Sequence, residues 1–232
     1  MPSGAARKEK GKRAVVLLSG GLDSATCLYW AKERGCRLEA LAVDYGQRHS
    51  RELRSARRVA TAAGARFTTL RLRLPWLRGN MLTDTRRPLP DVPLSRIGRG
   101  GIPATYVPGR NAVFTALGLS LADAVGAEMV VVGANSLDYS GYPDCRPAFY
   151  QAFQSVARTG TRRGAQGKRI RIATPLIHKD KAAIVRLALR LRVPLELTWS
   201  CYRGGRRPCG RCDSCKLRVK GFEKAGALDP AR

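Results

Sequence analysis

Two groups of residues in this 232-residue sequence have types and spacings that could carry chemistry. The first is the run Ser-Gly-Gly-Leu-Asp-Ser at residues 19–24, which directly follows the apolar residues 14–18. Two adjacent glycines allow a backbone turn that side chains would block. The N–H groups freed by such a turn, together with the N-terminus of a following helix, suit a phosphate group. The run therefore predicts an anion-binding loop between a strand and a helix.

Within this loop, hydroxyl groups are available to donate to phosphate oxygens from Ser19, Ser24 and Thr26. Asp23 would repel a phosphate, so we expect it to bind magnesium or the helix amides. The alternative is an ordinary strand–turn–helix connection with an Asp or Ser cap, because short motifs match by chance. The run is not a Walker loop, since the Gly-Lys-Ser/Thr ending is absent.

The second group consists of four cysteines within 15 residues near the C-terminus: Cys201, Cys209, Cys212 and Cys215. Four thiolates can surround Zn²⁺ tetrahedrally, so the spacing favours one structural zinc ion per chain. The alternatives are an iron–sulfur cluster and a redox-active Cys-x-x-Cys pair. We expect packing roles for the three isolated cysteines, Cys27, Cys36 and Cys145.

The elements that must position these residues alternate between strand and helix. Strands are predicted at residues 14–18, 38–43, 67–72, 128–132 and 169–173. Helices are predicted at residues 23–34, 49–63, 111–125, 148–158 and 179–191. This alternation is typical of an α/β fold with a parallel sheet, right-handed crossovers and helices on both faces. Ligands of such folds bind at the carboxyl ends of the strands, so the loops at Ser19, Tyr45 and Gly133 should share one edge.

Three regions are predicted along the chain. Residues 1–13 should be a disordered basic tail, residues 14–198 the α/β domain, and residues 199–232 a zinc-binding C-terminal segment. Within the domain, residues 75–109 form a long loop rich in proline and glycine. No apolar run is long enough to span a membrane and no secretory signal is recognisable, so we expect a soluble, cytoplasmic protein.

The charge balance is strongly basic. Lys and Arg number 43 against 17 Asp and Glu, which gives a formal net charge of +26. A basic surface can bind nucleic acid through its phosphates. The basic residues are scattered, however, and no single helix or arm collects them, so a compositional bias explains them better. Nucleic acid is thus a partner that the sequence permits but does not require.

Three further stretches carry a family resemblance: residues 43–49 (VDYGQRH), 106–111 (YVPGRN) and 138–147 (DYSGYPDCRP). Together with residues 19–24 and the cysteine tail, they resemble the 7-cyano-7-deazaguanine synthases, a family of the PP-loop ATP pyrophosphatase superfamily. The resemblance runs from about Val15 to Pro230. It implies a five-stranded parallel sheet of the adenine nucleotide alpha hydrolase type. It also implies a homodimer with ATP and Mg²⁺ at the loop.

The activity implied by the resemblance is ATP-dependent carbon–nitrogen ligation in queuosine and related deazapurine biosynthesis. The substrates would be 7-carboxy-7-deazaguanine, ammonia and ATP. Adenylation of the carboxylate would lead to an amide, and a second adenylation to the nitrile of 7-cyano-7-deazaguanine. A tRNA-modifying PP-loop enzyme remains an alternative that the basic charge favours. A zinc-stabilised nucleic-acid-binding module without turnover is another.

Site residues follow from the resemblance position by position. The ATP loop and its flanks would be Leu18, Ser19, Gly20, Gly21, Leu22, Asp23, Ser24, Ala25, Thr26, Cys27 and Leu28. The catalytic set would be Ser19, Asp23, Ser24, Arg110 and Lys181, where the two basic residues would contact phosphate or carboxylate. The substrate-binding set would be Tyr45, Gln47, Asn111, Asp138, Tyr139 and Asp144. In that set, tyrosines could stack on the base and Asp138 or Asp144 could accept its N–H groups. For these residues the alternatives are packing, turn or cap positions and surface ion pairs.

Overall fold

The structure is a computed structural model that describes residues 9–48, 50–77, 79–97, 101–135 and 141–231. Its five strands form one parallel sheet in the order β3-β2-β1-β4-β5. They span β1 Arg13–Leu17, β2 Arg37–Asp44, β3 Arg66–Arg71, β4 Met129–Val131 and β5 Arg171–Ala173. The parallel α/β sheet predicted from the apolar runs is therefore confirmed.

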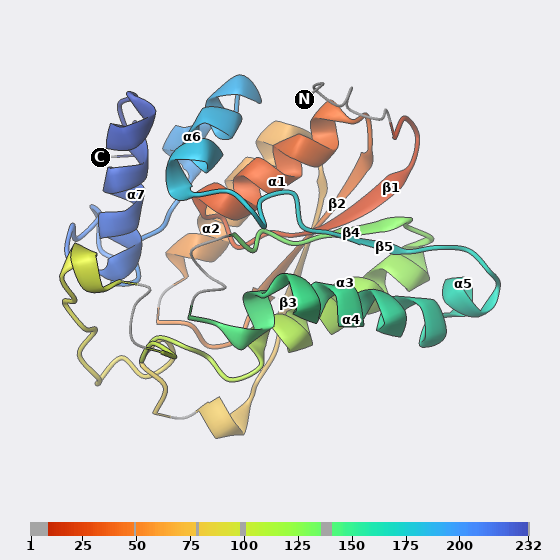
Figure 1. The fold of residues 1–232 in the computed structure, drawn as a ribbon, viewed down its shortest axis with the longest axis horizontal. Coiled ribbons are helices and arrows are strands. Elements are labelled where there is room, and N and C mark those ends of the chain that lie inside the picture. The colour runs from red at the N-terminus through yellow and green to blue at the C-terminus, as the bar shows by residue number, and fades with distance from the viewer. Residues whose placement is uncertain (1–8, 49, 78, 98–100, 136–140, 232) are drawn as a thin grey trace.

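Seven α-helices connect and cover the strands within the described residues. They are α1 Leu22–Glu33, α2 Arg51–Ala63, α3 Arg110–Val125, α4 Pro147–Thr159, α5 Arg162–Ala165, α6 Lys181–Arg190 and α7 Asp213–Ala225. Helices α1, α2 and α6 lie on one face of the sheet, and α3 and α4 lie on the other (Figure 1). No helix in the described part of the chain is both long and apolar enough to cross a membrane.

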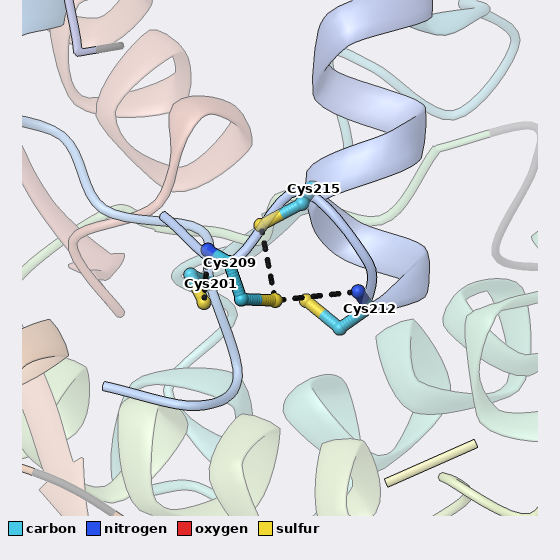
Figure 2. A group of neighbouring side chains, drawn as sticks. All are labelled: Cys201, Cys209, Cys212 and Cys215. Carbon is cyan, nitrogen blue, oxygen red and sulfur yellow. Dashed lines mark hydrogen bonds between the residues drawn. The ribbon is translucent and has the colours of Figure 1, made fainter. Parts of the chain in front are cut away.

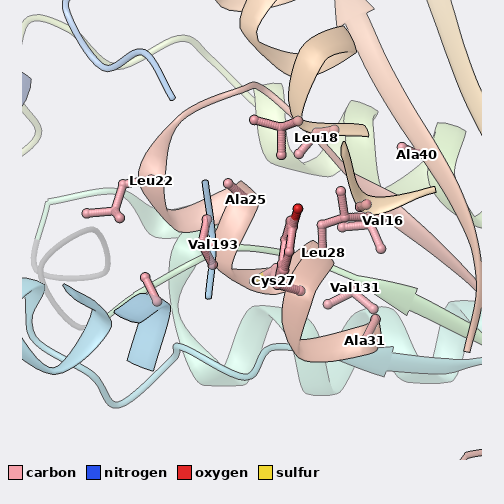
Figure 3. Packing of buried hydrophobic residues seen from close by; sticks show 14 of the residues in the cluster. Val16, Leu18, Leu22, Ala25, Cys27, Leu28, Ala31, Ala40, Val131 and Val193 are labelled. Atoms are coloured by element: carbon pink, nitrogen blue, oxygen red, sulfur yellow. The ribbon is translucent and has the colours of Figure 1, made fainter. Parts of the chain in front are cut away.

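Both faces of the sheet are buried, as in other parallel sheets. In β1, Ala14 and Val16 belong to the core cluster that contains α1, in which Figure 3 shows Val16, while Val15 belongs to the cluster that contains residues of α3 and α4. This alternation explains why the strand reads as a continuous apolar run rather than as an alternating one. Helix α1 itself is buried almost all round, for example at Leu28, because α2 and α6 flank it.

The topology creates a crevice at one edge of the sheet. From β1 the chain builds outward through β2 and β3, and then returns to the other side of β1 to form β4. At this reversal the loops that leave β1 and β4 diverge, and ligands of open α/β sheets bind there. The structure thus places the loop at Ser19 and the loop at Gly133 next to each other, as predicted. The Cβ that a side chain at Gly133 would carry lies only 3.4 Å from Ser24 N.

The N-terminal boundary differs from the prediction of a disordered tail through residue 13. Glu9 is buried, and its carboxylate pairs with Lys12 at 2.5 Å and with Arg171 of β5 at 3.2 Å. Arg13 already belongs to β1. The polar composition of residues 9–13 suggested disorder, whereas long-range ion pairs with the sheet order them. Residues 1–8 lie outside the described residues.

Helix α7 was not predicted from the sequence. It begins directly after Cys212 and ends at Gly226, whose φ of +69° provides a left-handed C-cap. It packs closely on α6, since a Cβ on Gly221 would lie 2.6 Å from Lys181 Cγ. This polar helix has too few apolar residues for their spacing to predict a helix. It is stabilised by its contact with α6 rather than by its own sequence.

The long loop at residues 75–109 is anchored at several points. The Arg48 guanidinium donates hydrogen bonds of 2.8–3.1 Å to four backbone carbonyls, those of Met81, Asp84, Thr85 and Arg87. Four residues of the loop itself, Leu77, Leu82, Leu89 and Val107, form a small buried apolar cluster. At the other side, Lys216 of α7 contacts Asp91 at 2.5 Å. The loop is therefore packed between the end of β2 and α7.

Replacing Arg48 with alanine should loosen the loop locally without unfolding the domain. Four charge-assisted hydrogen bonds are lost together, so amide exchange at Thr83, Asp84 and Arg87 should accelerate at least about tenfold. Hydrogen exchange measured by NMR or mass spectrometry checks this. Arg54→Ala, on the exposed side of α2, is the matched control and should leave these amides unchanged. Equal exchange in both variants would show that Arg48 does not hold the loop.

Candidate nucleotide-binding site and cysteine cluster

A cavity of about 280 Å³ lies at the carboxyl edge of the sheet, at the reversal between β1 and β4. Its walls come from the loops after β1, β2 and β4, the first turns of α2, α3 and α6, and the C-terminal segment. Residues that could do chemistry line it from the loops after β1 and β2 and from the first turns of α2, α3 and α6: Ser19, Asp23, Ser24, Tyr45, Gln47, Glu52, Arg110, Asn111 and Lys181. The fold thus brings together residues from four distant parts of the sequence.

The glycine loop turns tightly at the N-terminus of α1. Gly20 has a φ of +87°, and a Cβ there would lie 2.4 Å from the Glu52 carbonyl oxygen. No side chain fits this position, so the first glycine of the pair is required by contact as well as by conformation. Ser24 Oγ accepts from Ser19 N at 3.2 Å and donates to Gly21 O, which closes the turn.

The N-terminus of α1 is open toward the cavity. Its N-cap residue, Gly21, has no side chain, and no side-chain cap bond is made to the first-turn amides. Uncapped N–H groups and the positive end of the helix dipole favour an anion. The alternative of an Asp- or Ser-capped connection is therefore not what the structure shows: Asp23 and Ser24 lie inside the helix rather than at its cap.

Asp23 is held by two partners from distant elements. Its Oδ2 accepts from Lys181 Nζ at 2.7 Å and from Asn135 Nδ2 at 2.9 Å. Its Oδ1 is buried and has no hydrogen-bond partner among the described residues. An unsatisfied buried acceptor costs about 1–3 kcal/mol. A hard divalent cation prefers such oxygens, so the residue fits a magnesium ligand better than a partner of the helix amides.

Three of the six predicted substrate residues line the cavity, namely Tyr45, Gln47 and Asn111. Gln47 Oε1 accepts from Tyr45 N at 3.0 Å, which fixes the turn after β2. The Tyr45 ring meets Phe114 edge to face, with ring centroids 5.4 Å apart. Burial raises the pKa of the Tyr45 hydroxyl, and the neighbouring Arg110 guanidinium partly offsets that rise. This side of the cavity therefore combines an aromatic wall with one positive charge.

The structure gives Asp144 a structural task in place of the predicted contact with the base. It is buried, and its Oδ2 accepts from Asn111 N at 2.9 Å at the start of α3. The Asn111 side chain donates to Cys145 Sγ at 2.9 Å. Asp144 is not among the residues that line the cavity. Two other predicted positions, Asp138 and Tyr139, lie outside the described residues.

The predicted ATP segment divides into two parts. Leu18, Ser19, Gly21, Leu22, Asp23 and Ser24 line the cavity. The four residues that follow are buried in the core: Ala25, Thr26, Cys27 and Leu28. Thr26 Oγ1 donates to Leu22 O at 2.7 Å, so its hydroxyl is used within the helix. These four buried residues anchor the loop to the core.

Several cavity residues were missed by sequence reasoning. Glu52 lies in the first turn of α2, and burial raises the pKa of its carboxyl group to about 7 even though Arg110 acts in the opposite direction. Phe114, Trp199 and Tyr202 add aromatic surface. Glu52 follows the motif at residues 43–49 closely, and this position could have suggested a role in the site. A carboxylate in the first turn of a helix is common, however, because it interacts favourably with the helix dipole.

The four C-terminal cysteines converge in space, as their spacing predicted. Figure 2 shows Cys215 at the start of α7 and the other three on the preceding loop. All four sulfur atoms lie within 4.8 Å of one another. Backbone N–H groups of Arg203 and Cys209 point at Cys201 Sγ at 3.4 Å, and such bonds favour a thiolate. The remaining cysteines, Cys27, Cys36 and Cys145, lie apart from this group.

The sulfur donors fit a tetrahedral metal. Four Zn–S bonds of about 2.3 Å require sulfur atoms about 3.8 Å apart, and Cys209 Sγ and Cys215 Sγ are separated by 4.0 Å. Hydrogen bonds from the thiols of Cys212 and Cys215 lower the pKa of Cys201, and the hydrogen bond with Cys201 raises the pKa of Cys212 to about 12. A bound divalent cation would supply the charge that allows all four thiols to ionise.

The cysteine segment is attached to the glycine loop. Trp199 N donates to Gly20 O at 2.9 Å, and Trp199 Nε1 donates to Cys201 O at 2.8 Å. The Arg51 guanidinium stacks over the Trp199 ring at 3.7 Å and bonds the carbonyl of Gly205. Trp199 thus connects the cysteine cluster to the glycine loop, which forms part of the cavity wall.

Comparison with known proteins decides which family has this arrangement. A family model described as Queuosine biosynthesis protein QueC matches residues 13–226. The chain belongs to this family. The match covers all five strands and the four clustered cysteines, and it confirms the resemblance seen in the sequence motifs.

Curated relatives in the QueC family are similar over nearly their whole length. A 7-cyano-7-deazaguanine synthase from Synechococcus sp. (strain RCC307) is 51% identical over 218 residues, which cover 94% of this chain and 97% of the relative. Another from Anaeromyxobacter dehalogenans (strain 2CP-C) is 49% identical over 227 residues, or 96% of each chain. This QueC-family chain is therefore an enzyme rather than a binding module.

One solved structure shows the same fold at low sequence identity. It is NMN synthetase from Francisella tularensis, with a TM-score of 0.50 and 15% identity, covering 94% of this chain and 79% of that chain. At this identity the likeness shows the α/β fold alone.

Gly20→Ala should destabilise the protein, whereas Gly21→Ala should not. An alanine at a φ of +87° costs about 1–2 kcal/mol, and its Cβ would also collide with the first turn of α2. Gly21 has a φ of −79°, and its nearest Cβ contacts are 3.6 Å away. The melting temperature should fall by about 5 °C or more only for Gly20→Ala. Equal melting temperatures for the two variants would contradict the close contact between loop and α2.

Proposed function

We propose that this chain converts 7-carboxy-7-deazaguanine and ammonia to 7-cyano-7-deazaguanine at the expense of ATP, through an amide intermediate, in queuosine and related deazapurine biosynthesis. The observation that carries the proposal is the uncapped N-terminus of α1 beside the Asp23–Lys181 pair, in a chain about half identical to curated synthases. An anion site and a positive charge at one point of a deep cavity suit the phosphates of a nucleotide.

The chemistry requires activation because a carboxylate repels nucleophiles. Attack of a carboxylate oxygen on the α-phosphorus of ATP gives an acyl adenylate and releases pyrophosphate. Ammonia then displaces AMP, and one proton is lost, which leaves the amide. The amide oxygen attacks the α-phosphorus of a second ATP and releases pyrophosphate, and loss of AMP together with both N–H protons forms the C≡N bond. Each nitrile therefore consumes two ATP and yields two AMP.

Different residues of the cavity contribute to different parts of this reaction. Amides of the loop at Gly21 and Ser24 hold pyrophosphate, and Lys181 neutralises charge on the departing phosphates. Arg110 faces the same cavity and orients the substrate carboxylate toward the α-phosphorus. Tyr45 and Asn111 confine the planar base. Catalysis arises mainly from positioning and charge stabilisation, as expected for transfer at phosphorus.

Two metal ions belong to the same proposal. Asp23 Oδ1 would hold Mg²⁺ against the phosphates, where the ion neutralises developing charge. The four clustered cysteines would hold one Zn²⁺, which stabilises the C-terminal segment and takes no part in the reaction. We also propose that the enzyme works as a cytoplasmic homodimer, in a compartment that supplies ATP.

Product analysis tests the proposed reaction. The protein is mixed with ATP, ammonium and 7-carboxy-7-deazaguanine, and the products are identified by mass spectrometry. We expect the nitrile, with two AMP formed per nitrile and AMP formation dependent on the acid. AMP release that is unaffected by the acid, or an untouched acid in the presence of a tightly bound tRNA, would overturn the proposal.

Asp23→Asn should abolish AMP formation while the protein stays folded. The substitution keeps the size of the side chain but removes the charge that meets Lys181 and a cation, so we expect a loss of at least about 100-fold. Asp180→Asn, one residue before Lys181, is the matched control, because asparagine caps a helix as well as aspartate. Retained turnover in Asp23→Asn would remove this residue from the site.

Cys212→Ser should lower zinc content and thermal stability together, because metal binding and folding are linked. Wild-type protein should contain about one zinc per chain by atomic emission spectrometry. Cys36→Ser is the control, since Cys36 lies outside the cluster, and it should keep its zinc. A metal-free wild type with an undiminished melting temperature would contradict a structural zinc site.

A further inference from the structure

One carboxylate in the cavity has no task in the reaction described above. Two acidic residues line the cavity in the described part of the chain, Asp23 and Glu52. Asp23 is bonded to Lys181 and Asn135. For Glu52, no hydrogen bond or ion pair engages the side chain among the described residues, although α2 places it at the cavity wall. A partly buried carboxylate without a partner is costly, so a partner is expected from a ligand.

The surroundings of Glu52 limit what that ligand can be. The positive charge that acts on Glu52 is Arg110, which likewise lines the cavity, and the aromatic residues Tyr45, Phe114 and Trp199 also line it. Aromatic walls suit a flat ring system. A carboxylate repels phosphate and is an acceptor only, so Glu52 requires N–H or O–H donors on the flat ring.

The main chain of Glu52 also touches the glycine loop at residues 19–24, which we call the phosphate loop from here on. Its carbonyl oxygen is the atom that a Cβ on Gly20 would approach to 2.4 Å. The same residue thus abuts the phosphate loop through its main chain and faces the cavity through its side chain. A ligand with its reacting group at the loop would place its far edge against the Glu52 carboxylate.

From this arrangement we propose that Glu52 binds the guanine-like edge of the substrate, accepting hydrogen bonds from the N1–H and the 2-amino group. Two parallel donors on that edge match the two oxygens of one carboxylate. The sequence suggested this role for Asp138 or Asp144; Asp138 lies outside the described residues, and the Asp144 carboxylate accepts from Asn111 N at the start of α3. The proposal rests on the proposed function, since it concerns the same cavity and the same substrate.

The test combines a change in the residue with a change in the substrate. Wild type and Glu52→Gln are each assayed with 7-carboxy-7-deazaguanine and with its analogue that lacks the 2-amino group. A well-formed bidentate pair distinguishes such ligands by about 10- to 100-fold, so wild type should prefer the natural acid by that factor in kcat/KM. In Glu52→Gln the preference should shrink to about threefold or less, through KM for the acid, with KM for ATP and ammonium unchanged. Glu223→Gln, on the exposed side of α7, is the control and should keep the wild-type preference.

Three results would overturn the proposal. An undiminished preference in Glu52→Gln would show that other groups recognise the edge. A raised KM for ammonium alone would assign Glu52 to ammonia. Equal kcat/KM values for the two acids in wild type would show that the 2-amino group is not recognised.

Binding measurements separate this proposal from the proposed function. If wild type forms no nitrile from either acid, the proposed function fails, and calorimetric binding of the two acids to wild type and Glu52→Gln still decides the role of Glu52 by the same ratios. If Glu52→Gln does not fold, Glu52→Asp serves in both assays, because the shorter carboxylate should lose more affinity for the natural acid, which offers two donors, than for the analogue, which offers one. Loss of affinity for both acids to the same degree would count against the proposal.

Discussion

The close contact between Gly20 and the first turn of α2 is the constraint on which the site depends. The glycine has a φ of +87° and leaves no room for a Cβ against the Glu52 carbonyl oxygen. This contact brings the chain out of β1, turns it into α1, and leaves the amides of that helix uncapped at the cavity. It also fixes α2, and with α2 the Glu52 side chain, at a set distance from the phosphate loop. The proposed phosphate site and the proposed contact of Glu52 with the base are therefore held next to each other by the same contact.

The C-terminal segment completes the cavity from outside the sheet. Trp199 bonds Gly20 O through its main-chain N–H and bonds Cys201 O through its indole, so the cysteine cluster and the loop share one residue. Lys216 of α7 extends the connection to the long loop at Asp91. A metal held by these four cysteines would stabilise the proposed nucleotide site without touching it. This explains why a segment with few apolar residues can shape an active site.

Much of the fold could be predicted, because the strands are buried on both faces and read as apolar runs. The glycine loop and the four cysteines could be found because their chemistry depends on local spacing. Pairings across the fold could not be found. Glu9 pairs with Arg171, Asp144 accepts from Asn111 N, and Glu52 lines the cavity with no side-chain hydrogen bond among the described residues. Each of these depends on which charges meet in three dimensions, and a single sequence does not contain that information in local form.

The most direct test of the central claim follows the oxygen atoms of the acid. If the carboxylate is adenylated at the glycine loop, 7-carboxy-7-deazaguanine labelled with ¹⁸O in both carboxylate positions must transfer one ¹⁸O to each AMP. Mass spectrometry of AMP and pyrophosphate after a single turnover reads this out. We predict singly labelled AMP from both activation steps and unlabelled pyrophosphate. Unlabelled AMP, or label in phosphate or pyrophosphate, would contradict adenylation of the substrate at this site.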